Sequence, residues 1–148
     1  SPVDMRLTSS VFDAGGAIPT RHSCDGADVS PPLAIEAIPG GTAALALVMD
    51  DPDAPAGTWD HWVAYDIPMT TTIAEGVGEL GTPGSNSWGL PGYRGPCCPR
   101  GQTHRYVIRL YALDGRLGLP PGAATDRVFA AMSGHVLAEA SLMGRFSR

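Results

Sequence analysis

The chain has no lysine, so all ten of its permanently positive side chains are arginines. It also lacks an apolar run near the roughly 18 residues that a membrane-spanning helix needs, and its start shows no signal-peptide pattern. We therefore expect no membrane span and a cytoplasmic location. A secreted or periplasmic location stays open, because the chain begins with Ser1 rather than with methionine.

Charged residues make up only 17% of the chain, and they are unevenly distributed. Residues 1–93 hold twelve of the fifteen acidic residues, whereas residues 94–148 hold eight of the ten arginines. These arginines are scattered and are not interleaved with aromatic residues, as they would be in a nucleic-acid interface. We expect them to pair with acidic side chains of the same chain, and we expect no nucleic-acid partner.

Cysteine is also scarce. The three cysteines, Cys24, Cys97 and Cys98, follow neither a zinc-ligand spacing nor a Cys-x-x-Cys redox motif. A disulfide could join Cys24 to Cys97 or to Cys98 if their loops meet, whereas a bridge between the two adjacent cysteines would need strained geometry. Three free thiols are the remaining alternative.

Glycine and proline, in contrast, are abundant, at 19 and 14 residues in a chain of 148. They disfavour long helices and favour short strands joined by tight turns. The length suits one domain with a substantial core. The sequence therefore predicts a single, mainly β domain over residues 1–148.

Apolar runs and period-two patterns locate the strands of this domain. They predict strands at residues 7–12, 33–38, 43–49, 62–67 and 104–113. In the last of these, His104 and Tyr106 share a face with Ile108, because alternate residues of a strand point the same way. Residues 68–101 predict a long loop, which we expect to be ordered by a buried aromatic residue, since it carries Trp88 and Tyr93.

The spacing of apolar residues changes after Thr125. They recur at steps of three and four as far as Ala140, which is typical of an amphipathic helix capped by Thr125 or Asp126. Gly134 falls inside this pattern, and we expect it to allow close packing rather than to end the helix. The sequence thus predicts a C-terminal helix on the β domain.

Two groups of polar residues stand where predicted strands meet loops rich in glycine and proline. One group, Asp51, Asp53 and His61, flanks the turn of a predicted hairpin; the other, His104 and Tyr106, begins the longest predicted strand. If the hairpin and this strand lie in one sheet, the two groups converge on one site.

Three kinds of site fit these residue types. A carboxylate favours the charged form of a neighbouring imidazole, so the two histidines, the tyrosine hydroxyl and loop N–H groups suit phosphate or a carboxylate. The same geometry could orient a general base, although no Gly-x-Ser-x-Gly motif supplies a nucleophile. Two histidines and a carboxylate could also bind a metal, but no metal-ligand spacing supports this. The alternative is a purely structural role. The aspartates would then form only a turn with Asx hydrogen bonds, and each histidine would be only a hydrogen-bonded residue at the edge of a strand.

Ordered motifs extend over nearly the whole chain: Cys24-Asp25-Gly26, Asp51-Pro52-Asp53-Ala54-Pro55, Trp59-Asp60-His61-Trp62, Asn86-Ser87-Trp88-Gly89, Gly92-Tyr93-Arg94-Gly95-Pro96-Cys97-Cys98-Pro99 and His104-Arg105-Tyr106. In this order and spacing they resemble the phosphatidylethanolamine-binding protein (PEBP) family. The resemblance is strongest to its short bacterial and archaeal branch, the Raf kinase inhibitor-like proteins.

The resemblance implies a β-sandwich with Greek-key connections and short peripheral helices, and a small pocket for an anion such as phosphate or a phospholipid head group. By position, it implies that four residues line this pocket: Asp51, His61, His104 and Tyr106. It further implies that three others shape the wall: Asp53, Trp59 and Pro99.

One position departs from the pattern of the short branch, which usually reads Gly-Pro-Cys-Pro-Pro in the pocket loop. Cys98 replaces the first of the paired prolines. A cysteine there frees a backbone N–H and would bring a reactive sulfur to the pocket mouth. We therefore count Cys98 among the candidate ligand-binding residues.

Together, these features predict a non-enzymatic module that binds a small anion, with no cofactor and no metal. The resemblance implies action through a protein partner, such as a kinase or a protease, and a homodimer. The alternative is an enzyme that uses the Asp/His groups for acid–base chemistry on a small acidic metabolite.

Overall fold

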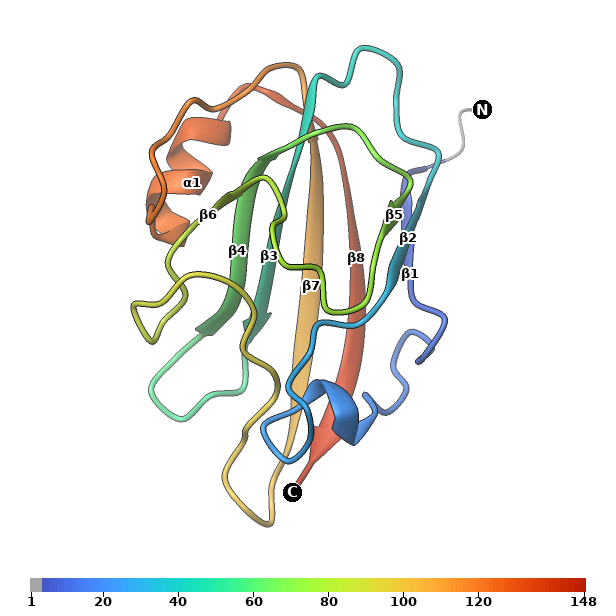
Figure 1. Ribbon diagram of the computed structural model, residues 1–148, viewed down its shortest axis with the longest axis vertical. Coiled ribbons are helices and arrows are strands. Elements are labelled where there is room, and N and C mark those ends of the chain that lie inside the picture. Colours follow the sequence, from blue (N-terminus) through green and yellow to red (C-terminus); the bar gives the residue numbers. More distant parts are fainter. Residues whose placement is uncertain (1–3) are drawn as a thin grey trace.

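The computed structural model describes residues 4–148, which form two antiparallel sheets and short helices (Figure 1). The elements are, in chain order, β1 (Arg6–Thr8), η1 (Thr20–His22), β2 (Leu33–Glu36), β3 (Ala44–Asp51), β4 (Trp59–Ile67), β5 (Thr72–Ile73), β6 (Thr82–Pro83), β7 (Thr103–Leu113), α1 (Thr125–Met132) and β8 (Val136–Ser147). The smaller sheet has the order β1-β2-β5, and the larger β6-β4-β3-β7-β8. Within the larger sheet, β7 returns to lie beside β3, as in a Greek key. The predicted mainly β sandwich is confirmed.

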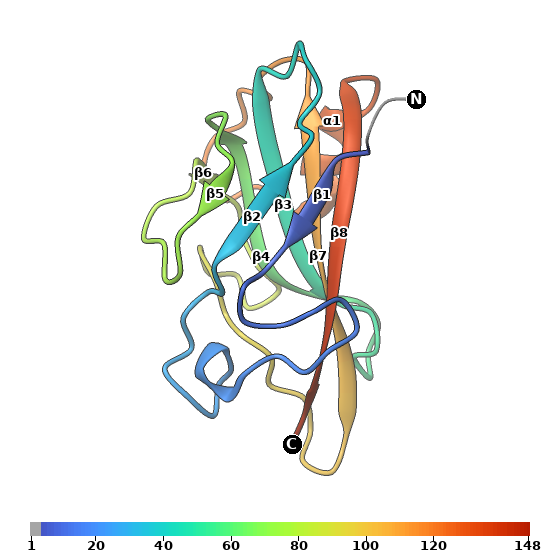
Figure 2. The ribbon, with the colours of Figure 1, turned by 90° about the vertical axis from the view of Figure 1, so that its right-hand side faces the viewer.

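The large sheet is covered on both faces. Figure 2 shows the small sheet in front of it and α1 behind it. On the face toward the small sheet, which we call the inner face, Leu47 and Met49 pack in the same core as Ile35. On the opposite, outer face, Ala46 packs in the same core as Val128 of α1. Because β3 is buried on both faces, its sequence is a continuous apolar run rather than an alternating one.

The predicted C-terminal helix is wrong beyond Met132. The chain turns at Gly134, whose φ is +82°, and a Cβ there would meet nothing within 4 Å. Gly134 therefore ends the helix by adopting a left-handed backbone and plays no part in close packing. The residues after it form β8, which pairs with β7 along its full length. This pairing outweighs the local helical spacing.

Smaller differences concern element boundaries. The predicted 7–12 strand is only the three residues of β1. The predicted long loop contains the short strands β5 and β6. Ala124, rather than Thr125 or Asp126, is the N-cap of α1, with no side-chain capping bond. Among residues 4–148, no helix is long and apolar enough to cross a membrane.

Three of the eight arginines of residues 94–148 form ion pairs with acids of the first half, in line with the expected internal pairing. These ion pairs are Arg105–Asp53 at 2.7 Å, Arg109–Asp50 at 3.1 Å and Arg148–Asp25 at 2.9 Å. The uneven charge along the sequence is thus balanced in three dimensions, and the pairs tie β7 and the C-terminal end of the chain to earlier loops.

Candidate functional site

The candidate residues meet at the end of the large sheet where β3 ends and β4 and β7 begin, the end that also carries the C-terminus in Figure 1. β3 and β4 are antiparallel, and Asp51 lies opposite Trp59. On the other side of β3, Asp50 pairs with Val107. The predicted hairpin is confirmed, and β7 lies in the same sheet beside it.

A β-bulge in β4 sets the direction of His61. Met49 pairs with Trp62 and Asp50 with Asp60, so His61 is the extra residue between them. A bulge re-aims a side chain that strict alternation would send to the other face. His61 therefore contacts Tyr106 edge to face, with ring centroids 5.3 Å apart.

Asp51 and His104 form a buried pair. The Nδ1–H of His104 donates to Asp51 at 2.7 Å, and the two side chains are only 6% and 5% exposed. The second carboxylate oxygen of Asp51 accepts the backbone N–H of Asp53 at 2.8 Å. The other ring nitrogen of His104 lies 2.7 Å from the amide of Gln102. Both carboxylate oxygens of Asp51 therefore accept hydrogen bonds, one from His104 and one from the turn between β3 and β4.

His61 is held by the backbone rather than by a carboxylate. Its Nδ1–H donates to the carbonyl of Arg94 at 2.8 Å, so in the neutral ring the lone pair is on Nε2. Burial lowers the pKa of His61, and the Arg94 carbonyl and the charge of Asp51 oppose this shift without reversing it. The lowered pKa favours the neutral imidazole of His61.

Tyr106 carries the least satisfied group of the cluster. The residue is 1% exposed, and its hydroxyl has no hydrogen-bond partner within residues 4–148; the hydroxyl of Ser30 is the other buried side-chain atom in this state. The hydroxyl lies beside the thiol of Cys98 and the backbone of Cys97, but neither meets hydrogen-bond geometry. Burial raises the pKa of Tyr106, and the charge of Asp51 and the Cys98 thiol add to this shift, so the protonated phenol is favoured. A buried unpaired hydroxyl costs about 1–3 kcal/mol, which a bound acceptor would recover.

Two tryptophans flank His61. Trp88 lies 5.0 Å from the His61 ring and 5.5 Å from Trp59, both edge to face. The guanidinium of Arg94 lies 5.4 Å from the Trp88 ring. Trp88 is 37% exposed, so it is not the buried aromatic that anchors this loop; Tyr93 packs against the core instead. Trp88 forms a partly open wall.

Three neighbours of the cluster were missed as site residues by the sequence reasoning: Trp88, Arg94 and Gln102. The first two lie within motifs that carry the family resemblance, which was the available signal. Gln102 had none, because only the tertiary structure brings its amide to His104.

Two predicted wall residues lie at the margin of the cluster. Asp53 accepts three hydrogen bonds from Arg105, which hold the pKa of that carboxyl well below its usual range. Pro99 is exposed, and its carbonyl accepts the N–H of Gln102 at 3.1 Å. These residues brace the turns that carry His104 and Gln102 but make no recorded contact with His61 or Tyr106.

The cysteines divide into a bridge and a free thiol. Cys24 is joined to Cys97, one of the two pairings left open by the sequence. Cys98 is free and only 2% exposed, with its sulfur 3.5 Å and 3.6 Å from the carbonyls of Gln102 and Phe146. The expected position at the pocket mouth is therefore wrong, because the Cys98 thiol is buried. The thiol lies beside the hydroxyl of Tyr106, and a role for it in ligand binding stays a prediction.

Other possible sites are distinct from this cluster. Within residues 4–148, no group of three or more His, Cys, Asp or Glu side chains is arranged to hold a metal ion. A cavity of about 410 Å³ lies beside β4 and β6 and is lined by Trp62, Leu80 and Tyr93 among others, but by none of the four cluster residues. Polar groups, not cavity size, mark the candidate site.

Comparisons with known proteins agree with the fold and the motifs. Residues 8–147 match the model of the family described as phosphatidylethanolamine-binding protein. The UPF0098 protein of Methanothermobacter thermautotrophicus is 48% identical over 97% of this chain and 99% of its own length. A phosphatidylethanolamine-binding protein homolog from Chlamydia trachomatis is 37% identical, with a TM-score of 0.94 and 98% of each chain covered.

A second solved structure extends this likeness. Escherichia coli YbcL, described as a member of the mammalian PEBP family, superposes with a TM-score of 0.90 at 26% identity, over 99% of each chain. With the family match over almost the whole sequence, these likenesses establish that the chain belongs to the phosphatidylethanolamine-binding protein family.

Proposed function

We propose that this chain binds a small anion of the phosphate or phosphate-ester class at Asp51, His61, His104 and Tyr106. The observation that carries the proposal is the hydroxyl of Tyr106, which is buried, protonated and without a partner among residues 4–148. Such a group is a hydrogen-bond donor in need of an acceptor, and a phosphate oxygen is a strong acceptor.

The charge of the site suits an anion whose binding is accompanied by protonation of His61. The neutral form of His61 is favoured when the site is free, and an anion beside it would favour the imidazolium form. The guanidinium of Arg94, against Trp88, adds a fixed positive charge at the margin. The carboxylate of Asp51 would repel an anion, but its oxygens already accept hydrogen bonds from His104 and from the backbone of Asp53.

A titration with inorganic phosphate and with phosphoethanolamine tests this function. We expect saturable shifts of the His61 and His104 imidazole signals in nuclear magnetic resonance spectra, and none with ethanolamine alone. Shifts with ethanolamine alone would contradict the proposal. So would a His104 signal that shifts equally in the wild type and in the His61→Ala/Tyr106→Phe variant. Binding of phosphoethanolamine and not of inorganic phosphate would identify an ester group as essential.

An enzyme remains the second candidate, because the Asp51–His104 pair has the geometry that orients a general base. The amide of Gln102 blocks the ring nitrogen that would take the proton, which favours the binding module. Turnover of a small phosphate ester by the wild type that is lost in His104→Ala would support the enzyme. Binding without any turnover would oppose it.

Proposals about the partners rest on the family resemblance, and the proposal about the compartment rests on the disulfide. The family resemblance supports a kinase- or protease-class partner and a homodimer, which affinity capture and sedimentation equilibrium would test. The Cys24–Cys97 disulfide favours an oxidising compartment over the cytoplasm. We therefore favour the periplasmic or secreted alternative, and alkylation of thiols in intact cells would distinguish the two locations.

A further inference from the structure

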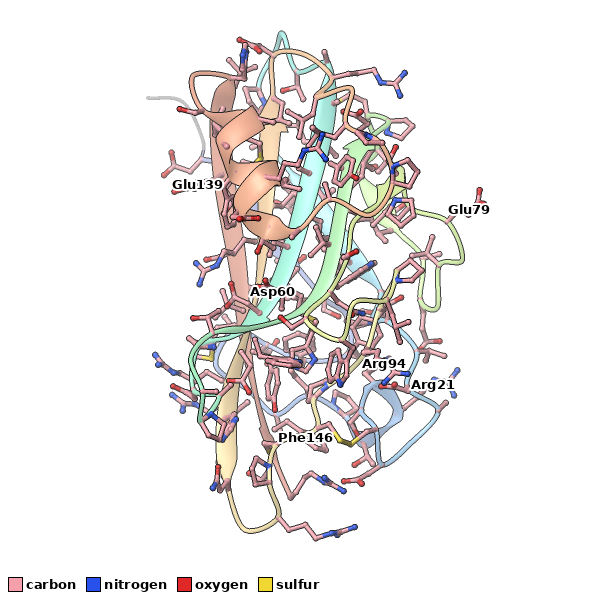
Figure 3. All side chains as sticks on the ribbon, turned by 90° about the vertical axis from the view of Figure 1, so that its left-hand side faces the viewer. Arg21, Asp60, Glu79, Arg94, Glu139 and Phe146 are labelled. Carbon is pink, nitrogen blue, oxygen red and sulfur yellow. A yellow bond between two sulfur atoms is a disulfide. The ribbon has the colours of Figure 1, made fainter. Side chains whose placement is uncertain are left out.

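The Cys24–Cys97 disulfide lies in the wall of the candidate site. It joins the loop of residues 20–28, which begins with η1, to the loop of residues 93–98, which passes beside β4. Figure 3 shows the disulfide in the same lower region of the molecule as Arg94 and Arg21. Both bridged cysteines are exposed, so a reductant can reach them.

The two bridged loops are also joined by hydrogen bonds, among them one from the backbone N–H of Cys24 to the carbonyl of Pro96 at 3.1 Å. The N–H of Gly95 donates to the carboxylate of Asp28 at 2.8 Å, and the hydroxyl of Tyr93 donates to the carbonyl of His22 at 2.6 Å. A Cβ on Gly95 would lie 2.0 Å from that same carbonyl, so only glycine allows this approach. The position of one loop therefore depends on that of the other.

The second of these loops also sets the orientation of His61. Arg94, three residues before Cys97, donates its N–H to the carbonyl of His61 at 3.1 Å. Its own carbonyl accepts the Nδ1–H of His61 at 2.8 Å. A movement of Arg94 would thus change both the strand edge and the ring that the proposed anion contacts.

The two sulfurs of the bridge have different surroundings. The guanidinium of Arg148 lies 3.6 Å from the sulfur of Cys97 and 3.2 Å from the carbonyl of Cys98. Asp25 holds this guanidinium with two hydrogen bonds, at 2.9 Å and 3.0 Å, and offsets part of its charge. A cation beside one sulfur stabilises its thiolate, which makes Cys97 the better leaving group in thiol–disulfide exchange.

We propose that Cys24–Cys97 is a reversible redox site, reduced by a dithiol, whose state sets the anion affinity of the cluster around His61. This proposal rests on the proposed anion-binding function. A thiolate of the dithiol attacks the sulfur of Cys24, the Cys24–Cys97 bond breaks, and its electron pair goes to Cys97 as a thiolate beside Arg148. The second thiol of the reductant then releases Cys24, so the dithiol becomes a cyclic disulfide and the two cysteines take up its two protons.

The first test needs no ligand. The rate of reduction by dithiothreitol is measured for the wild type, for Arg148→Gln and for Arg100→Gln. Arg100 is exposed and makes no recorded contact with either sulfur, so it controls for the change in net charge. We expect Arg148→Gln to be reduced roughly three- to tenfold more slowly, and Arg100→Gln to match the wild type. Equal rates in all three proteins would overturn the assigned leaving group.

The second test measures coupling to the site. Inorganic phosphate is titrated into the oxidised, reduced and reoxidised protein, while amide spectra report whether the fold is kept. We expect about tenfold weaker binding in the reduced form, equivalent to one buried hydrogen bond, and recovery on reoxidation. The Cys24→Ser/Cys97→Ser variant should behave like the reduced form.

Three results would overturn the coupling: equal phosphate affinity in both redox states, an unmoved His61 signal on reduction, or loss of the fold on reduction. Phosphate binding to neither form would instead overturn the proposed function. The two failures are distinguishable, because the reduction rates and the His61 signal are measured without phosphate.

Discussion

The two faces of the large sheet carry similar polar residues at the same end but use them differently. On the outer face, Asp50 pairs with Arg109, and Asp60 accepts the hydroxyl of Thr125 at 2.7 Å, beside the start of α1 (Figure 3). On the inner face, Asp51 pairs with His104, and the hydroxyl of Tyr106 has no hydrogen-bond partner among residues 4–148.

The difference teaches that polar residues at a strand end do not by themselves make a site. The outer-face groups named above satisfy one another and fasten β7 and α1 to the sheet. The inner-face groups are more deeply buried, and among residues 4–148 they retain an unused donor, the hydroxyl of Tyr106. Burial also acts in opposite directions on the two faces, raising the pKa of Asp60 and lowering that of His61, so both groups shift toward their neutral forms.

The largest effect should come from Asp51 rather than from the adjacent Asp50. Asp51→Ala leaves buried His104 without its partner, and we expect it to cost about 3 kcal/mol of unfolding free energy. Asp50→Ala should cost less, about 1 kcal/mol, because its partner Arg109 is 39% exposed and can be solvated by water. Only Asp51→Ala should abolish phosphate binding, because Asp51, and not Asp50, holds the Nδ1–H of His104. Urea unfolding and phosphate titration measure the two effects. Loss of binding in Asp50→Ala to the same extent would remove the distinction between the faces.

Substitution of His61 should weaken phosphate binding to a smaller extent, and substitution of its neighbour Asp60 should hardly change it. His61→Ala removes a donor to the proposed anion, so phosphate affinity should fall about thirtyfold, or roughly 2 kcal/mol. Asp60→Asn, on the outer face, keeps the size of the side chain and should leave the affinity within about twofold. Calorimetric titration measures both variants. An affinity that depends equally on Asp60 would contradict the inner-face assignment.

The pH dependence should differ between folding and binding. The pKa of His61 is lowered in the native state, so below about pH 6.5 the unfolded chain protonates first, and acidification removes stability. From pH 7 to pH 5, we expect the wild type to lose more unfolding free energy than His61→Gln. Phosphate affinity should instead rise on acidification, because the anion favours the imidazolium. Equal pH slopes of the wild type and the variant would contradict this.

Most of the inner cluster could be predicted from the sequence, because hairpin pairing and the alternation of side chains along a strand bring its residues together. A hairpin brings Asp51 toward His61, and His104 and Tyr106 share a face because they are two residues apart. The bulge at His61 could not be predicted, because it depends on the register of pairing between β3 and β4.

The errors of sequence interpretation have a common cause. Residues after Gly134 have helical spacing, but β7 offers them a full strand partner, which local pattern does not reveal. Cys98 looked reactive from its motif, yet the carbonyls around it belong to distant residues such as Phe146. Tertiary contacts decide both cases.

The most direct measurement compares two buried tyrosines, Tyr106 on the inner face and Tyr65 on the outer. The Tyr65 hydroxyl donates to the Pro120 carbonyl and accepts the N–H of Ala123, so Tyr65→Phe should lose about 1–2 kcal/mol of stability and keep its phosphate affinity.

For Tyr106→Phe we predict the reverse: an unfolding free energy unchanged or raised by up to about 1 kcal/mol, because an unpaired buried hydroxyl is removed, and phosphate binding weaker by about tenfold. A Tyr106→Phe protein that is less stable and binds phosphate as well as the wild type would contradict the account.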